Sequence, residues 1–396
     1  MDKIKLFNAE VITPFELIHK GTVLIDNGRI ACVSGADVQT EDYLEIDACG
    51  NYVSPGFIDI HIHGGGGFDF MDGTVEAYLG AAEAHARHGT TSLVPTTLTS
   101  TNEELKRTFE VFKAAKVQNQ KGSELLGIHL EGPYFALSQK GAQDPRYIKN
   151  PKPEEYEEIL QWSDDILRWS AAPELEGALE FGRFIKARGV LPSIAHSDAI
   201  DEEVFKAFDC GFTHVTHLYS GMSGVRRINA YRFAGVIETA LLMDDMTVEI
   251  IADGVHLPQT LLKLIYKTKG PHRIALVTDS MRAAGMPDGE SILGSLKDGQ
   301  TVIVEDGVAK LPDRSAFAGS VATADRLVRT MVKNAEVPLV MAVRMMTLTP
   351  ASIIGADRRK GSLAKGKDAD IVMFDKDIGI KMSMIKGKIV YREKNE

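Results

Sequence analysis

From residue 56 to about residue 354, short apolar runs alternate with longer segments whose apolar residues recur every three or four positions. The short runs have the length of buried strands, and the longer segments, such as VEAYLGAAEAHARHG, have the pattern of amphipathic helices. The runs are FIDIHIH, TSLVPTT, LLGIHLEG, ILRWSAAPE, VLPSIAHS, HVTHLYS, VEIIADGVH and IALVTDS. Eight strands alternating with helices predict a (β/α)8 TIM barrel. A doubly wound sheet is the alternative, although no G-x-G-x-x-G or P-loop pattern accompanies the runs.

The two ends of the chain have a different pattern, in which β-rich pieces are separated by turn residues. IKLFNAEVIT, GTVLIDNG and RIACVSG lie near the start, and DADIVMFDKD, GIKMSMIKG and KIVYREKNE lie near the end. Neither end could form a core alone, so we expect both to meet in one small antiparallel β-sandwich domain. The predicted organisation is a small domain from 1–55 and 355–396 and a barrel domain from 56–354.

Composition and charge disfavour several classes of protein. The 396 residues carry a formal net charge of −10 without a basic stripe, which argues against nucleic acid as a partner. The three cysteines include no C-x-x-C pair, which is typical of a reducing compartment. Neither a signal-peptide core nor a run of about 18 apolar residues is present. We therefore expect a cytoplasmic protein that does not bind a membrane.

Polar side chains fall where the predicted barrel strands end. Side chains in a strand alternate between faces, so Asp59, His61 and His63 share one face of the first strand and isoleucines share the other. The carboxyl ends of barrel strands form the active-site rim. Burying imidazoles and carboxylates there without partners would cost on the order of several kcal/mol, a penalty that a metal ion removes. The six candidate metal ligands are His61, His63, Glu131, His196, His217 and Asp279.

Other histidines have a simpler interpretation. A lone histidine in a strand is more often a hydrogen-bonded structural residue than a metal ligand, so we interpret His129 and His214 in that way. His85 and His88 lie in a predicted helix. We interpret this pair as a solvated or helix-end feature.

The ordered series of motifs resembles the amidohydrolase superfamily. The series comprises HxH on the first strand, EGP on the third, single histidines ending the fifth and sixth, and an aspartate ending the eighth. PGFIDIHIHGGGGFD, GIHLEGPY, KGAQ, AHS, THLY, ADGVH, VTDSM and FAGS further resemble the N-acetylglucosamine-6-phosphate deacetylase family. The resemblance implies hydrolysis of the acetamide of N-acetylglucosamine 6-phosphate, or of a close epimer such as the galacto or manno form. The products would be acetate and the amino-sugar 6-phosphate.

The resemblance also implies a metal arrangement. The third and fourth strands contain no lysine that could be carboxylated to bridge two ions, so Glu131 is the implied bridging carboxylate. The implied metal positions are His61, His63 and Asp279 for one ion, and Glu131, His196 and His217 for the other. Such donors suit one or two divalent ions per subunit, zinc or iron above all. A divalent ion lowers the pKa of water to about 7 and polarises a carbonyl group. Asp279 would take the proton of the water and return it to the leaving amine.

Contacts with the sugar are implied for several mouth residues. His256, in Asp253-Gly-Val-His256, would donate to the carbonyl or sugar oxygens, and a purely structural loop histidine is the alternative. Gln143 stands where some family members have histidine, and a glutamine can still donate to and accept from a hydroxyl. Ser220-Gly221 stands where members often have Asn-Ala, so that backbone contacts would remain.

Glycines are expected to bring backbone close to the ligand. Gly64–Gly67 follow the HxH motif, and glycine permits both positive φ and a close approach of the chain. A flexible turn is the alternative interpretation. The resemblance implies a similar role for the backbone of Ala318-Gly319-Ser320, which precedes the last barrel helix.

Two adjacent cations, Arg226 and Arg227, follow the sixth strand. Arginine suits bidentate capture of phosphate, whereas a solvated surface pair is the ordinary interpretation. In the resembling family such an arginine reaches the neighbouring subunit's site, which implies a homodimer and a phosphosugar as the small-molecule partner. The spacing after His217 favours Arg227 over Arg226.

Two other functions compete with this one. An amidohydrolase could act on another amide, such as a cyclic imide or an N-acyl amino acid, although the arginine pair and Glu131 favour the phosphosugar. A non-catalytic barrel scaffold is the alternative from another class. Such a scaffold would be expected to have lost metal ligands or Asp279, and all of these residues are present.

Overall fold

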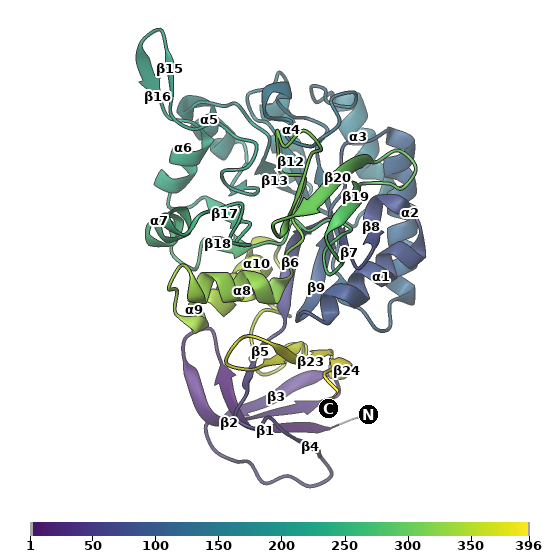
Figure 1. Cartoon of the computed structure of the whole chain (residues 1–396), viewed down its shortest axis with the longest axis vertical. Helices are drawn as coiled ribbons and strands as arrows, with labels where there is room; N and C mark the ends of the chain where they lie inside the picture. Colours follow the sequence, from purple (N-terminus) through teal and green to yellow (C-terminus); the bar gives the residue numbers. More distant parts are fainter. Residues whose placement is uncertain (1–2, 395–396) are drawn as a thin grey trace.

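Eight parallel strands, each followed by a helix, form the centre of the computed structural model, which describes residues 3–394 (Figure 1). The barrel strands are β6 (Phe57–Ile62), β9 (Thr90–Pro95), β11 (Ile128–Glu131), β12 (Ile166–Ala171), β13 (Leu191–Ile194), β14 (His214–Val215), β17 (Thr247–Ile250) and β18 (Ile274–Leu276). The helices that follow them in turn are α1 (Val75–Ala86), α2 (Asn102–Gln118), α3 (Pro153–Trp162), α4 (Ala178–Lys186), α5 (Asp201–Asp209), α6 (Val236–Leu242), α7 (Gln259–Lys269) and α8 (Ala324–Lys333). The predicted (β/α)8 barrel is confirmed.

Neighbouring barrel strands pair in sequence order. β6 pairs with β9, and β11 to β18 form one continuous parallel sheet. An isolated bridge between Thr96 and His129 joins the two groups on one side. On the other side the barrel closes where the N–H of Asp279 donates to the carbonyl of His61 at 2.9 Å. The carboxyl ends of all eight strands therefore lie at one rim.

Strand β6 shows how the sequence places polar side chains inside the barrel. All six of its residues are buried, as expected for a strand that has a helix layer on one side and the barrel interior on the other. Ile58 and Ile60 pack in one cluster with Ala275 of β18 and with α10 (Leu348–Ile353). Asp59 lies on the opposite face and accepts a hydrogen bond from Thr278 Oγ1 at 2.5 Å. The predicted alternation of faces is present.

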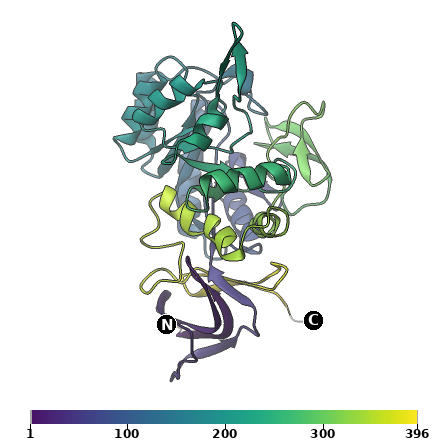
Figure 2. The same ribbon diagram turned by 90° about the vertical axis from the view of Figure 1, so that its left-hand side faces the viewer.

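The two ends of the chain form one sheet beneath the barrel (Figures 1 and 2). Its strands are β1 (Ile4–Ile12), β2 (Leu17–Asp26), β3 (Arg29–Ser34), β4 (Leu44–Asp47), β5 (Tyr52–Pro55), β22 (Ile371–Phe374), β23 (Ile380–Ile385) and β24 (Lys388–Arg392). They enclose a core that joins Leu6 and Val23 to Met373 and Met384. The expectation of a purely antiparallel sheet was wrong, because β1 pairs in parallel with both β4 and β5. We propose domain boundaries near residues 55 and 355.

Several smaller elements complete the fold. β7 (Gly64–Gly65) and β8 (Phe68–Asp69) form a tight ribbon after β6, and β10 (Glu124–Leu125) extends the sheet beside β9. The hairpin of β15 (Arg226–Ile228) and β16 (Tyr231–Phe233) projects from the body of the molecule, as Figures 1 and 2 both show. A three-stranded sheet of β19 (Gly289–Leu293), β20 (Gln300–Glu305) and β21 (Val308–Lys310) follows β18, and α9 (Leu339–Met345) follows α8. Among residues 3–394, no helix combines the length and the apolar character needed to cross a membrane.

Candidate metal centre and active site

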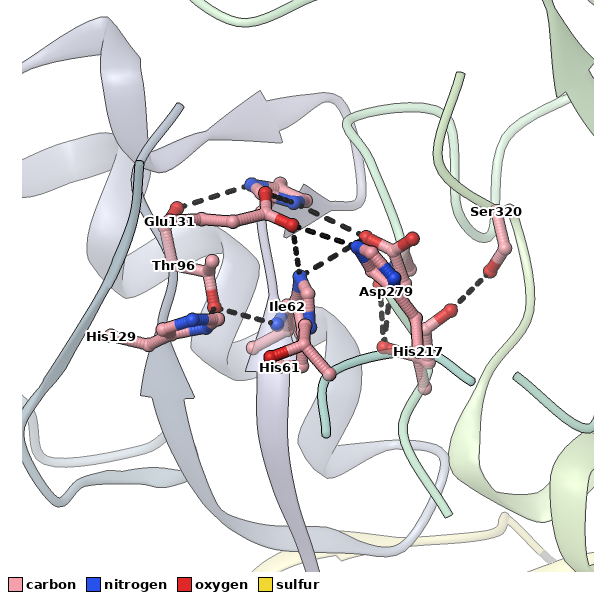
Figure 3. Close-up of polar contacts among 12 residues, drawn as sticks. His61, Ile62, Thr96, His129, Glu131, His217, Asp279 and Ser320 are labelled. Carbon is pink, nitrogen blue, oxygen red and sulfur yellow. Dashed lines mark hydrogen bonds and ion pairs between the residues drawn. The ribbon is translucent and has the colours of Figure 1, made fainter. Parts of the chain in front are cut away.

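The six residues predicted as metal ligands come together at the barrel rim. His61 lies in β6 and His63 follows it, Glu131 ends β11, and the other three follow β13, β14 and β18 within three residues. Figure 3 shows His61, Glu131, His217 and Asp279 of this group. Three of these residues have a left-handed backbone, with φ of 46° at His196, 27° at His217 and 47° at Asp279. Such conformations are uncommon outside glycine and cluster at functional sites.

Glu131 is the centre of the group, because all four imidazoles direct Nε2 toward its carboxylate. Its Oε1 lies 2.9 Å from Nε2 of His217, 3.4 Å from that of His196 and 3.5 Å from that of His61. Its Oε2 lies 3.4 Å from Nε2 of His63. A carboxylate with both oxygens among nitrogen donors from separate strands has the arrangement expected of a bridging ligand.

Asp279 lies on the other side of the HxH pair. Its Oδ1 is 3.2 Å from Nε2 of His63 and 3.4 Å from Nε2 of His61. Two groups of residues can each offer ligand atoms within 4.8 Å of one another: His61, His63 and Asp279, and His61, Glu131 and His217. The Nε2 atom of His61 is buried and has no hydrogen-bond donor or acceptor as partner among the described residues. A divalent cation would satisfy this atom and the surrounding donors together.

Hydrogen bonds at the far side of the rings orient the imidazoles. A neutral ring that donates Nδ1–H to an oxygen leaves the lone pair of Nε2 free to bind a metal. The acceptors are Oε2 of Glu249 for His61 (3.1 Å), the carbonyl of Thr96 for His63 (3.2 Å) and the carbonyl of Gln139 for His196 (2.8 Å). Three of the four rings are therefore held in the tautomer that metal binding requires.

The charges at the site oppose one another strongly. Burial alone would lower the pKa of His61, but the carboxylates of Asp279 and Glu131 outweigh burial and raise it to about 9. The same two carboxylates overcome burial at His63 and raise its pKa to about 10. Burial would raise the pKa of Glu131, but the charge of His61 and hydrogen bonds from the histidines hold it well below its usual value. The carboxylates are therefore ionised, and a metal must displace protons from the imidazoles.

Two other barrel histidines have only protein partners. His129 contacts Thr96 Oγ1 at 3.2 Å and Ser170 Oγ at 2.7 Å, and His214 contacts Thr247 Oγ1 at 2.7 Å. Burial is the main cause of the lowered pKa of both rings. The structural interpretation of these two residues agrees with their surroundings.

His85 lies at a helix end, in the last turn of α1, but it is not solvated. Its side chain is buried, and its Nε2–H donates to the carbonyl of Gly64 at 2.9 Å. Burial lowers its pKa to about 4, so the ring is neutral at ordinary pH. The solvated interpretation was wrong because the second half of α1, including Ala84 and His85, packs against the ribbon that follows the HxH motif. His88, in contrast, is partly exposed beside Asp325.

The glycines after His63 allow the chain to pack tightly against itself. A Cβ on Gly64 would lie 2.1 Å from the carbonyl oxygen of Phe68, and one on Gly65 would lie 2.3 Å from Nε2 of His85. These distances exclude any side chain at either position. None of Gly64–Gly67 is among the described residues that line the cleft, so their close approach is to protein rather than to a ligand.

A cleft of about 280 Å³ opens above the candidate metal ligands. Its walls include Gln143, Ser220, Gly221 and His256, all four of which were predicted to contact substrate. Further lining residues, which the sequence did not indicate, are Leu98, Tyr219, Leu293 and Phe317. Ala318 is itself buried and donates its N–H to the carbonyl of Ala309 at 3.0 Å. Its neighbours Phe317 and Gly319 face the cleft instead.

Gln143 and His256 each have a firm partner. Gln143 Nε2 donates to Glu131 Oε2 at 2.8 Å, and its Oε1 accepts from the N–H of Thr99 at 3.0 Å. His256 Nδ1 lies 2.8 Å from Asp253 Oδ2, and its ring packs against Phe317 with centroids 4.6 Å apart. Gln143 therefore supports Glu131, a candidate metal ligand, and His256 lines the cleft.

The two arginines have different environments. Arg226 Nη1 lies 3.1 Å from Asp198 Oδ1, and Nη2 donates to the carbonyl of Asp198 at 2.7 Å. Arg226 thus anchors the base of the β15–β16 hairpin to the body of the same chain. Arg227 is exposed on β15, opposite Arg232 of β16.

Two fully buried charged residues beneath the ligands were missed. Arg168 of β12 and Glu249 of β17 have no exposed side-chain surface and contact each other. Each is the one charged residue inside an otherwise apolar stretch of strand, LRWSA and VEIIA. A single charge within a buried run is the signal that could have identified them, because such a charge needs a buried partner.

Comparison with known proteins identifies the family. The Amidohydrolase family profile matches residues 52–390. The chain is 34% identical to the N-acetylglucosamine-6-phosphate deacetylase of Bacillus subtilis (strain 168), over 99% of this chain and 98% of that protein. It is likewise 34% identical to the N-acetylgalactosamine-6-phosphate deacetylase of Escherichia coli O157:H7, over 92% of this chain and 93% of that protein.

A solved structure supports the same assignment. It is a point mutant of the Mycobacterium smegmatis N-acetyl-D-glucosamine-6-phosphate deacetylase in complex with N-acetyl-D-glucosamine-6-phosphate. It matches with a TM-score of 0.90 at 30% identity, over 98% of this chain and 100% of that one. The profile match covers the barrel and the part of the small sheet domain that begins at residue 52, and the Bacillus subtilis relative covers both domains. This chain belongs to the amidohydrolase family, in the group that contains the N-acetylhexosamine-6-phosphate deacetylases.

Proposed function

We propose that this protein hydrolyses the acetamide of an N-acetylhexosamine 6-phosphate to acetate and the free amino-sugar phosphate. The observation that carries the proposal is the cleft bordered by Asp279 and Glu131, which lie among four imidazoles, three of them oriented by a second hydrogen bond. Relatives that cover 92–99% of this chain are named for the gluco and galacto sugars, which makes N-acetylglucosamine 6-phosphate the first candidate and its galacto epimer the second.

The donor set fits one or two divalent ions, with zinc or iron best suited to imidazole and carboxylate ligands. The proposed ligands are His61, His63 and Asp279 at one position and Glu131, His196 and His217 at the other. When bound, such an ion supplies Lewis acidity toward the acetamide carbonyl and lowers the pKa of a neighbouring water.

Asp279 is the proposed general base and acid. Burial would raise its pKa, but the positive charge of His61 and the hydrogen bond from His63 lower it, so that the group is a carboxylate at neutral pH. Its side chain is 11% exposed and borders the cleft, where it can reach an attacking water. The carboxylate accepts the proton of that water, and the resulting acid donates it to the nitrogen of the leaving amine.

Wall residues of the cleft are proposed to hold the sugar. Asp253 holds the Nδ1 of His256. The Nε2 of a neutral ring can therefore accept a hydrogen bond from a sugar hydroxyl, whereas a protonated ring donates a hydrogen bond from Nε2 to an oxygen. Ser220, Gly221 and the backbone beside Ala318 would contact the sugar from the opposite loops. Gln143 would act chiefly by holding Glu131.

The phosphate requires a cation that the cleft does not contain. No lysine or arginine is among the described residues that line it. Arg227 is exposed on a projecting hairpin, and Arg226 is engaged by Asp198 within its own chain. We therefore propose a homodimer in which the β15–β16 hairpin of one subunit brings Arg227 to the phosphate in the other subunit's cleft.

Acetate release from a panel of N-acetylhexosamines, with and without the 6-phosphate, tests the proposal. We expect turnover of the gluco or galacto phosphosugar and a large loss of kcat/KM without the phosphate. Equal turnover of the sugar with and without the phosphate would contradict the proposed phosphate contact. Turnover of another amide alone would contradict the proposed substrate class. Arg227→Ala should raise KM for the phosphosugar, whereas the control Arg232→Ala, on the opposite strand of the hairpin, should leave KM near the wild-type value.

A further inference from the structure

A buried charged pair lies directly beneath the metal ligands. Arg168 of β12 and Glu249 of β17 are both fully buried, and Arg168 Nη1 contacts Glu249 Oε1. Nη1 also donates to the carbonyl of Ile60 at 3.3 Å, and Nη2 donates to Thr216 Oγ1 at 2.8 Å, whereas the buried Nε has no hydrogen-bond partner among the described residues. These contacts fix the guanidinium against three other strands of the barrel. The carboxylate of Glu249 therefore faces an immobile cation.

The two oxygens of Glu249 have separate partners. Oε1 faces Arg168 and lies 3.2 Å from Nε2 of His214. Oε2 accepts from His61 Nδ1 at 3.1 Å and from the backbone N–H of His217 at 3.3 Å. One oxygen is thus engaged by structural residues, and the other is engaged by two candidate metal ligands.

We infer that Glu249 is a positioning residue for the metal centre and that Arg168 holds it in place. Glu249 fixes the tautomer of His61, because only a ring that carries the proton on Nδ1 presents a free lone pair at Nε2. Its second hydrogen bond restrains the backbone of His217, where φ is 27°. This inference rests on the metal centre proposed above and concerns metal affinity rather than the identity of the substrate.

His61 differs in this respect from the other oriented rings. His63 and His196 donate to backbone carbonyls of Thr96 and Gln139, which no substitution removes. Only the orientation of His61 depends on an ionised side chain. A buried arginine–carboxylate pair adds little net stability compared with apolar residues of similar size. The effect of the Arg168–Glu249 pair on the orientation of His61 can therefore be measured separately, through the affinity for the metal.

Glu249→Gln isolates this effect. A carboxamide has one acceptor oxygen, and the charge of Arg168 would hold it. The amide NH2 would then face the Nδ1–H of His61 and the N–H of His217, so that two donors oppose it. We expect zinc affinity, measured by competition with a chromophoric chelator, to fall by about 10-fold to 100-fold.

His214→Gln is the matched control. His214 is as buried as Glu249 and contacts it, but His214 does not orient the ring of a candidate metal ligand as Glu249 does. We expect this control to lose stability while its zinc affinity stays within about twofold of wild type, the scatter expected of a site left intact. Wild-type zinc affinity in Glu249→Gln, or equal losses in both variants, would overturn the inference.

Two further measurements decide the case if Glu249→Gln does not fold. Glu249→Asp keeps the charge but withdraws the oxygens by one methylene, and it should also weaken zinc binding. In the zinc-loaded wild type, nitrogen-resolved NMR of the histidine rings should show a protected Nδ1–H on His61, and its absence would overturn the inference. Zinc binding without acetate release from any phosphosugar would contradict the proposed function and leave these measurements valid.

Discussion

Lys360 links the small sheet domain to the barrel, and its replacement by methionine should cost much of the protein's stability. The ammonium group is fully buried among three carboxylates: it contacts Asp370, lies 2.6 Å from Glu124 Oε2 and lies 3.5 Å from Asp368 Oδ2. Glu124 belongs to β10 beside the barrel, whereas Asp368 and Asp370 precede β22 of the small domain. The three acids have the spacing of a metal site, but Lys360 already supplies the cation.

The magnitude follows from the state of Glu124. Burial would raise its pKa, but Lys360, Lys386 and Arg359 outweigh burial and lower that pKa from 4.5 to about 2. At about 1.4 kcal/mol for each pKa unit, the interaction is worth about 3.5 kcal/mol, shared among the three cations. Removal of one partner from a buried pair typically costs about 3–5 kcal/mol. We therefore expect Lys360→Met to lower the free energy of unfolding at neutral pH by about 3 kcal/mol.

Urea unfolding, followed by fluorescence at a fixed zinc concentration, measures the change. Lys386→Met is the control, because Lys386 contacts the same carboxylate at 3.0 Å but is 48% exposed, and exposed pairs contribute about 1 kcal/mol or less. The folded-state pKa of Glu124 lies below its unfolded value, so its contribution is complete above pH 4.5 and is lost as pH falls toward 2. Lys360→Met should weaken this dependence. If both variants lose the same stability, the buried cation is not what joins the domains.

Three other predictions concern the site itself. Gly221→Ala should reduce kcat/KM by about tenfold or more in acetate-release assays, because a Cβ there would lie 2.8 Å from Nδ1 of His196 and φ is +56°; an unchanged rate would show that the loop adjusts freely. Burial lowers the pKa of His85 to about 4, below its unfolded value of 6.5, so its contribution to stability is complete above pH 6.5 and is lost as pH falls to 4. His85→Gln should remove that part of the pH dependence of urea unfolding, and an unchanged slope would refute this account. Chelation of the metal should abolish activity, and zinc should restore it. Zinc binding should release protons from His61 and His63, because their pKa values of about 9 and 10 place protons on both rings in the metal-free protein. Calorimetry in buffers of different ionisation enthalpy measures that release, and binding without proton release would contradict the assigned ligands.

The barrel and its rim could be predicted because both follow from periodicity. Parallel barrel strands are buried on both faces and therefore appear as apolar runs, and polar residues at their carboxyl ends must meet at one rim. His61, His63 and Glu131 needed no more than this alternation to be placed together. The parallel pairing of β1 with β4 and β5 was not predictable in the same way, because alternation does not determine strand direction.

The β15–β16 hairpin and the three-stranded sheet β19–β21 were not predicted from the sequence, for a different reason. β15–β16 and β19–β21 are insertions between a barrel strand and its helix, where neither strand length nor helix length is imposed by the barrel. The side chains of β15–β16 are largely exposed, so the contrast between apolar and polar positions is weak there. β19–β21 bury Leu293, Val302 and Val304 in a small core that is separate from the main core of the barrel. Residues such as Leu293 and Phe317 enter the cleft wall from these insertions and leave no periodic pattern in the sequence.

The left-handed backbone at three candidate metal ligands is the feature of the site that the residue types indicate least. None of the three residues is a glycine, although φ is positive at His196, His217 and Asp279. Each such conformation costs on the order of 1–3 kcal/mol and persists only where the surrounding structure enforces it. The enforcement comes from other strands: Asp279 donates its N–H to His61 and accepts from the N–H of Ser320, and His217 donates its N–H to Glu249. Because these partners lie far away in the sequence, the ligands reach their positions only when the whole barrel has closed. Metal binding should therefore be a sensitive measure of barrel closure, and substitutions beneath the rim should weaken it before they abolish folding.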